Sequence, residues 1–199
     1  MTIYLAARFL HVVGALAMFS ALGLEVAVLR GLALARSTRE AHAALAGLRL
    51  QARIGGAGAL LILVPGGYLA AAAWGMPPWL LAAIGALVAI IALGAIVSRK
   101  LLAALVPALE RAVDGVEVQW LLRRLWSSLA ARAVLLLGIV ALMSTKPGWA
   151  GAVLTLGLAA SAAAAAAWLA LGRRSAGVPV MAAGGESSAV ALGAEQRTR

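Results

Sequence analysis

Two apolar stretches of this chain carry six side chains whose types suit a metal, proton-transfer or transport site: His11, Met18, Glu25, Arg132, Met143 and Lys146. On a helix that advances about 100° per residue, the first three share one face and the last three share another. If the two helices are neighbours, His11, Glu25, Arg132 and Lys146 form an intramembrane polar seam.

Glu25 and Arg132 are expected to form an ion pair near the inner end of this seam. An unpaired arginine deep in a bilayer costs about 3 kcal/mol on insertion scales, and a facing carboxylate relieves that cost. One alternative is that Arg132 extends its guanidinium to the lipid headgroups, and another is that Arg53 or Arg99 is the partner of Glu25. The sequence leaves these alternatives open.

His11 has the widest chemistry in the seam, because a neutral imidazole can ligate haem or copper or relay a proton. Bis-histidine haem needs a second ring, and His42, the only other histidine, lies in a basic segment between apolar runs. Copper suits imidazole and thioether ligands, with Met18 and Met143 as candidates, although Met18 is about two helical turns from His11. We expect no metal or cofactor, and a His11 that is hydrogen-bonded to a neighbouring helix.

The composition indicates that lipid is the solvent for most of the chain. Hydrophobic residues make up 64% of it and charged residues 12%, against about 25% charged in soluble domains. The net charge of +10 would fit a nucleic-acid partner in a soluble protein, but here the basic residues lie between apolar runs. There they act as topology signals and contact anionic lipids, so we expect no nucleic acid as a partner. The absence of cysteine excludes disulfides and thiolate metal sites.

Apolar segments that can cross a bilayer, which takes about 20 helical residues, recur along the chain. Five transmembrane helices are predicted, at residues 3–29, 54–74, 79–97, 127–145 and 150–171. The first is too long for the core of a signal peptide, about 7–15 residues, and Glu25 and Arg30 interrupt it. Residues 1–174 are therefore predicted to be one transmembrane domain, and residues 175–199, rich in Ala, Gly and Ser, a disordered cytoplasmic tail.

The basic clusters orient these helices. They all fall on one side of the membrane if the N terminus is outside and the C terminus is cytoplasmic. The basic segment 30–53 is itself expected to be helical, capped by Ser37 or Thr38, and to continue into the second span. The predicted fold is an all-α, polytopic membrane helix bundle of five transmembrane helices in a bacterial cytoplasmic (inner) membrane.

Pro65, Gly66 and Gly67 lie near the middle of the second span and predict a helix break. Proline removes one backbone hydrogen bond and leaves the carbonyl one turn earlier, near Leu61, without its donor. Such interruptions at mid-membrane mark binding sites in transporters, but an isolated proline also serves as a packing device. Both interpretations stay open.

Several short motifs resemble a known family. They are Arg8-Phe9-Leu10-His11-Val12-Val13-Gly14-Ala15, the second span with Arg53 before it, Trp79-Leu80-Leu81-Ala82-Ala83, and Met143-Ser144-Thr145-Lys146-Pro147-Gly148. They are similar to an uncharacterised bacterial family of predicted integral membrane proteins, a domain of unknown function. The Phe-Leu-His opening also resembles the copper-resistance D-like membrane proteins. The first resemblance implies a membrane location without an activity, and the second implies metal handling through His11 alone.

Three functions are compatible with this sequence. The first is a non-enzymatic accessory or scaffold protein, whose partners are the lipid bilayer and other membrane proteins or a second copy of the chain. The second is a small transporter or proton-coupled permease that uses the polar seam and the Pro65 interruption. The third is a haem- or copper-binding membrane protein that uses His11. We predict the first, with no catalytic residues.

Overall fold

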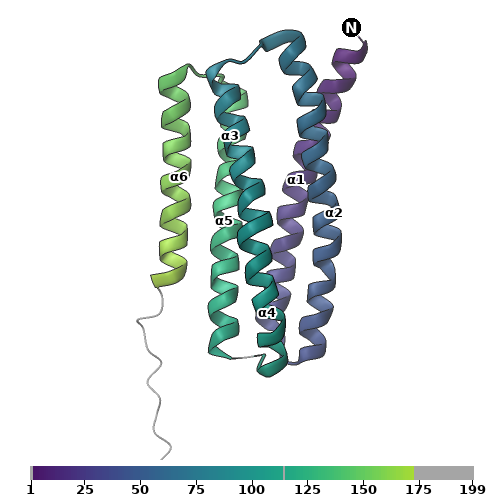
Figure 1. Ribbon diagram of the computed structural model, residues 1–199, viewed down its shortest axis with the longest axis vertical. Helices are drawn as coiled ribbons and strands as arrows, with labels where there is room; N and C mark the ends of the chain where they lie inside the picture. The colour runs from purple at the N-terminus through teal and green to yellow at the C-terminus, as the bar shows by residue number, and fades with distance from the viewer. Residues whose placement is uncertain (1, 114, 173–199) are drawn as a thin grey trace, which may run out of the picture.

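The computed structural model describes residues 2–113 and 115–172, and every regular element in these ranges is helical (Figure 1). The elements are α1 (Thr2–Leu34), α2 (Thr38–Leu69), the π-helix η1 (Ala70–Trp74), α3 (Pro78–Ala92), the π-helix η2 (Leu93–Ser98), α4 (Arg99–Arg111), α5 (Val116–Thr145) and α6 (Trp149–Gly172). Because α2 continues into η1, and α3 continues through η2 into α4, the described chain forms five helical rods that run alternately up and down.

Four of these rods are long and apolar enough to cross a membrane: Thr2–Leu34, Thr38–Trp74, Pro78–Arg111 and Val116–Thr145. The fifth rod, α6, is also apolar, but its apolar segment, Trp149–Ala165, is shorter than the other four. The prediction of an all-α bundle of membrane type is therefore confirmed. The four long rods extend beyond their predicted spans because the basic segments that separate the apolar runs are helical too. The predicted tail, 175–199, lies outside the described residues.

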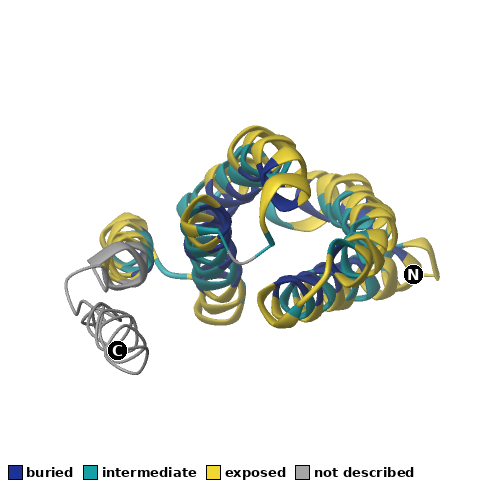
Figure 2. Ribbon diagram, turned by 90° about the horizontal axis from the view of Figure 1, so that it is seen from below, coloured by how far each residue is buried: buried dark blue, intermediate teal, exposed yellow. Residues whose placement is uncertain are grey.

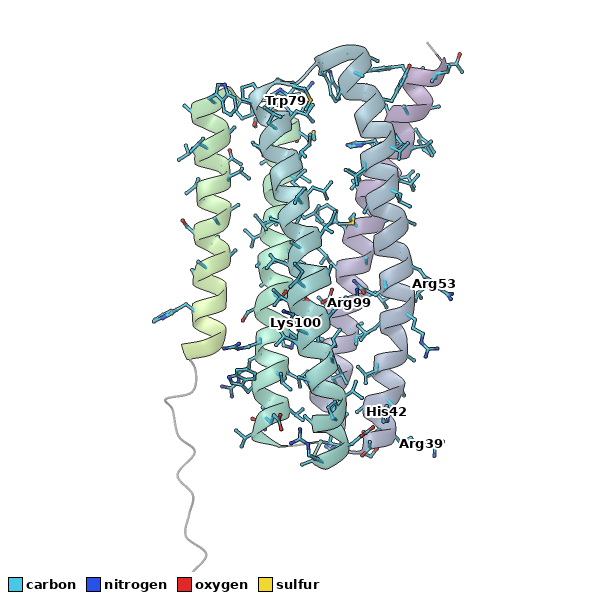
Figure 3. The ribbon with its side chains drawn as sticks, viewed as in Figure 1. Arg39, His42, Arg53, Trp79, Arg99 and Lys100 are labelled. Atoms are coloured by element: carbon cyan, nitrogen blue, oxygen red, sulfur yellow. The ribbon has the colours of Figure 1, made fainter. Side chains whose placement is uncertain are left out.

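The two ends of the bundle differ in their side chains. At one end, here called the tryptophan end, lie the start of α1, the turn 75–77 with Trp74 and Trp79 beside it, and the turn 146–148. The opposite half, here called the basic half, carries Arg39, His42, Arg53, Arg99 and Lys100 (Figure 3). This separation is the charge asymmetry on which the predicted orientation depends.

Ser37 ends the turn between α1 and α2 and starts α2. Its side chain accepts a hydrogen bond from the backbone N–H of Glu40 at 3.3 Å, while the Glu40 carboxylate accepts one from the Arg36 N–H at 2.8 Å. These two bonds satisfy backbone donors that a helix start otherwise leaves free. The predicted cap is confirmed, and it makes α1 and α2 a tight antiparallel hairpin.

Glycines let the backbones of α1 and α2 approach closely. A Cβ atom on Gly14 would lie 2.9 Å from the Gly58 carbonyl oxygen, and one on Gly58 would lie 3.0 Å from the Gly14 carbonyl oxygen. Gly47, further along, makes room for the Val28 side chain, whose Cγ2 would lie 2.8 Å from a Cβ atom there. At Gly14 and Gly58 the missing side chains allow close contact between backbones, which is a usual source of attraction between helices in lipid.

The prediction of a helix break at Pro65, Gly66 and Gly67 is wrong. The α-helix continues through all three residues to Leu69 and passes into the π-helix η1 without interruption. Proline removes one hydrogen bond from a helix and adds a steric clash. Pro65 is buried inside a long helix that packs against α1, and this packing compensates for both costs. The end of the helix comes ten residues later, where Gly75 adopts a positive φ of 65°.

The buried apolar side chains divide along the length of the bundle. A leucine-rich core in the basic half joins α1, α2, α4 and α5, and it includes Leu29, Leu105, Leu109 and Leu125. At the tryptophan end a second core joins η1, α3, α5 and α6 without α1. Figure 2 shows exposed residues on the outer faces of the rods, with α6 standing outside the others beside α5. The α1–α2 hairpin is thus held to the rest of the bundle mainly through the basic half.

Candidate functional site

A buried polar cluster lies where α1, α2, η2 and α5 meet. The Arg132 guanidinium donates to the Glu25 carboxylate through Nη2, and each side chain is 6% exposed. Gln51 donates its amide N–H to the other carboxylate oxygen of Glu25 at 3.3 Å. Arg132 Nε donates to the Ser128 carbonyl at 3.3 Å, and the hydroxyl groups of Ser128 and Ser98 are 3.1 Å apart. The charged pair therefore has hydrogen-bond partners on both sides.

The expected ion pair is therefore present, and the alternative partners are not used. Arg53 and Arg99 are exposed, so neither replaces Arg132. Within the described residues no buried side-chain nitrogen or oxygen lacks a hydrogen-bond partner. Each charge of this buried pair depends on the other, because removal of one side chain would leave an uncompensated charge in an apolar environment.

Gln51 was missed by sequence reasoning, although the hairpin carries a signal for it. In an antiparallel pair, residues equally far from the turn lie opposite each other, and Gly14 faces Gly58 while Val28 faces Gly47. The same register places Gln51 opposite Glu25. The π-helix η2 contributes too, because Gly94 leaves room for Arg132, whose Nη1 would lie 3.6 Å from a Cβ atom there.

A cavity of about 980 Å³ occupies the half of the bundle toward the tryptophan end, between α1, α2 and η1 on one side and α3 and α5 on the other. This volume is at the upper end of the range usual for small-molecule sites, about 300–1,000 Å³. Most of its lining is apolar. Below it, Met18, Leu87, Ile90 and Leu136 form a buried apolar cluster, with Leu87 and Leu136 also lining the cavity. This cluster is the floor that separates the cavity from the Glu25–Arg132 pair.

His11 lines the cavity and is hydrogen-bonded to the neighbouring helix, as expected. Its Nδ1 lies 3.0 Å from the Ile62 carbonyl oxygen, and because a carbonyl only accepts, Nδ1–H is the donor. Gly66 makes this position possible, since a Cβ atom there would lie 2.9 Å from Nδ1. The Pro65 region and His11 thus meet, through Gly66 and Ile62. The second ring nitrogen of His11, Nε2, takes no part in this bond.

Two cations stand at the rim of the cavity. Arg8 and Lys146 both line it, and both side chains are exposed. Lys146 adopts a left-handed conformation, φ 46°, at the end of α5. Its Nζ lies 5.1 Å from the ring centroid of Trp74 and 5.9 Å from that of Trp79, distances typical of cation–π contacts. Of the residues of the predicted seam, His11 and Lys146 thus line the same cavity, and Lys146 lies against the two tryptophans.

The candidate metal ligands are divided between parts of the bundle. His11 and Met143 line the cavity, whereas Met18 is packed in the floor with Leu87, Ile90 and Leu136. His42 lies in the basic half (Figure 3). In residues 2–113 and 115–172 there is no group of three His, Asp or Glu side chains that could hold a metal ion. The donor set for haem or copper is therefore incomplete around His11.

A scan against protein-family models and searches of curated proteins and of solved structures found no match. The fold and the cavity define a helical bundle of membrane type with an internal apolar site. The function has to be argued from that site.

Proposed function

We propose that this protein is a small, non-enzymatic carrier that binds an apolar or amphipathic molecule between its helices. It crosses a bacterial cytoplasmic membrane with five helices, with the N terminus and the tryptophan end outside and the basic half on the cytoplasmic side. The separation of basic residues from the tryptophan end supports this orientation, because basic segments are retained in the cytoplasm and tryptophan favours the interface.

One observation carries the proposal: the cavity of about 980 Å³ that reaches His11 and Gly66. In carriers the substrate site lies between helices and is open to one side of the membrane at a time. The cavity lies toward the tryptophan end, and the floor and the Glu25–Arg132 pair lie between it and the basic half. This arrangement is that of a carrier facing outward.

A scaffold function would rest on small residues that let a partner helix approach closely. Two of the glycines that could do so, Gly14 and Gly58, pack against each other instead. Their close contact builds the α1–α2 hairpin and leaves no such face for another protein at these positions.

Photochemical labelling tests whether the cavity is a binding site. The full-length protein in phosphatidylcholine nanodiscs is irradiated with a long-chain alcohol that carries a diazirine near the end of its tail, and labelled residues are located by peptide mass spectrometry. We expect labels on cavity-lining residues such as Phe19, Leu87 and Leu136. Labels on Leu158 of α6, which is 64% exposed, give the level of contact with bulk lipid.

A pair of glycine variants gives the control. Gly67 lines the cavity and a Cβ atom there meets nothing within 4 Å, so Gly67→Phe is chosen to place a ring at the cavity wall. Gly56 on the same helix is equally open but does not line the cavity, so Gly56→Phe is its match. Cavity labels should fall severalfold in Gly67→Phe only. If both variants are labelled like the wild type, the cavity is not a binding site and the carrier function is wrong. If Gly67→Phe unfolds, Ala15→Leu, at another lining residue, takes its place.

A further inference from the structure

The cavity is polar at one end and apolar at the other. Its polar lining residues come from the first turns of α1, the last turn of α5 and the turn that follows it, all at the tryptophan end: Tyr4, Arg8, His11, Ser144 and Lys146. Toward the floor, the lining residues include Phe19, Leu87 and Leu136. A molecule that matches this lining has a polar head at the outer surface and an apolar tail toward the middle of the bilayer, the orientation of an outer-leaflet lipid.

The polar end also has a definite charge. None of the described lining residues is acidic, and Arg8 has no hydrogen-bond or ion-pair partner within the described residues. Lys146 is held by the neutral rings of Trp74 and Trp79, so its positive charge is not compensated by a carboxylate. The cavity thus has two uncompensated positive charges at its mouth.

We propose that the ligand of this cavity is an anionic amphiphile, whose phosphate or carboxylate group contacts Arg8 and Lys146 while its hydrocarbon tail extends to the floor. This inference rests on the proposed binding function and adds the ligand class. Arginine and lysine both recognise phosphate and carboxylate oxygens, and two cations, one on α1 and one directly after α5, can contact one headgroup together. The tail replaces water against the apolar lining.

A series of ligands with one tail and different heads tests the charge. Four diazirine probes of equal length carry a carboxylate, a phosphate monoester, a hydroxyl or an ammonium group, and are used at a pH where the carboxylate is ionised. Both anions should label Phe19, Leu87 and Leu136 more strongly than the alcohol, and the amine should label them least. The ratio of phosphate to carboxylate labelling then identifies the preferred headgroup.

Matched cation variants locate the preference. In the double variant Arg8→Gln, Lys146→Gln, anion labelling should fall about fivefold to tenfold, which is the size expected for two exposed ion pairs, and alcohol labelling should not change. Arg53→Gln with Lys100→Gln removes the same charge from exposed residues of the basic half and should have no effect (Figure 3). Thermal unfolding of each variant confirms that it is folded, and Arg8→Lys with Lys146→Arg should restore the preference.

The outcomes separate the two proposals. If the alcohol labels the cavity as well as the anions do, and Gly67→Phe still removes that label, the ligand is not selected by charge and the present inference is overturned while the binding function stands. If no probe labels the cavity above the level at Leu158, both are overturned.

Discussion

Of the two ion pairs in residues 2–113 and 115–172, Glu25–Arg132 is the buried one. Both side chains are almost completely buried, and Gln51 and the Ser128 carbonyl take up hydrogen-bonding positions that the pair leaves over. Replacement of both residues by apolar side chains of similar volume would leave the protein as stable or more stable. Removal of one charge alone leaves the other without compensation. The pair therefore fixes the position of α1 relative to α5 more than it adds net stability.

Arg132→Met should lower the free energy of unfolding by about 3–5 kcal/mol, because the Glu25 carboxylate then remains buried without its counter-charge. The double variant Glu25→Gln, Arg132→Met should recover most of that loss, since no buried charge is left. Thermal unfolding of the purified protein in a mild detergent measures both. Arg53→Met, at an exposed arginine, is the control and should resemble the wild type. Equal stability of Arg132→Met and the wild type would mean that the pair does not form.

At the scale of elements, the α1–α2 hairpin is the unit that forms one side of the cavity. Its helices are held together along their length by contacts at Gly14, Gly47 and Gly58, and the Ser37 cap sets their turn. The bond from His11 to the Ile62 carbonyl adds a polar contact at the cavity itself. Because these contacts depend on the absence of a Cβ atom, they are sensitive to the smallest substitution.

Gly14→Ala should therefore destabilise the protein by about 1–3 kcal/mol, the usual cost of overpacking. The added Cβ atom would lie 2.8 Å from Leu61 Cβ and 2.9 Å from the Gly58 carbonyl oxygen, so the backbones must separate. On the same helix, a Cβ atom at Gly23 meets nothing within 4 Å, and Gly23→Ala should leave stability unchanged or raise it. Thermal unfolding of the two variants side by side tests the contact. A Gly14→Ala variant as stable as Gly23→Ala would contradict it.

For the whole molecule, the cavity exists because the α1–α2 hairpin and the remaining helices meet mainly in the basic half and in the floor. The leucine-rich core holds them together there, whereas at the tryptophan end the core is built without α1. In residues 2–113 and 115–172 the two ion pairs, Arg111–Glu117 and Arg132–Glu25, lie in the basic half, and Arg8 and Lys146 stand at the cavity mouth. The proposed orientation turns that mouth toward the outside.

Cysteine labelling in intact cells tests the orientation, and the chain contains no cysteine of its own. Met76→Cys and Gly148→Cys, in the turns of the tryptophan end, should react with a membrane-impermeant maleimide directly. Ala35→Cys and Ala112→Cys, in the opposite turns, should react only after permeabilisation. Ser187→Cys should react only after permeabilisation if α6 crosses the membrane. It should react directly in intact cells if the chain crosses four times. Reaction of Ala35→Cys in intact cells would reverse the proposed orientation.

Much of this architecture can be predicted from the sequence, since apolar runs of sufficient length become helices wherever water is absent. Helical geometry and the cost of an unpaired charge favour the Glu25–Arg132 pair, but the sequence leaves Arg53 and Arg99 open as partners, and only the structure shows that both are exposed. The contribution of Gln51 depends on the register between α1 and α2, which the sequence does not state. The helix break expected at Pro65 does not occur, since packing against α1 outweighs the single hydrogen bond that proline removes.

The sequence by itself thus determines the all-helical, lipid-compatible character of the chain and the charge asymmetry between its ends, because both depend on hydropathy and on charges that are local in sequence. Only the tertiary structure decides that His11 and Gly66 meet, that Met18 lies in the floor, and that a cavity opens toward Arg8 and Lys146. These features depend on how far neighbouring helices separate along their length. That separation is set by the sum of many small contacts between distant residues, from Gly14 on Gly58 to the leucine-rich core, which no single stretch of sequence encodes.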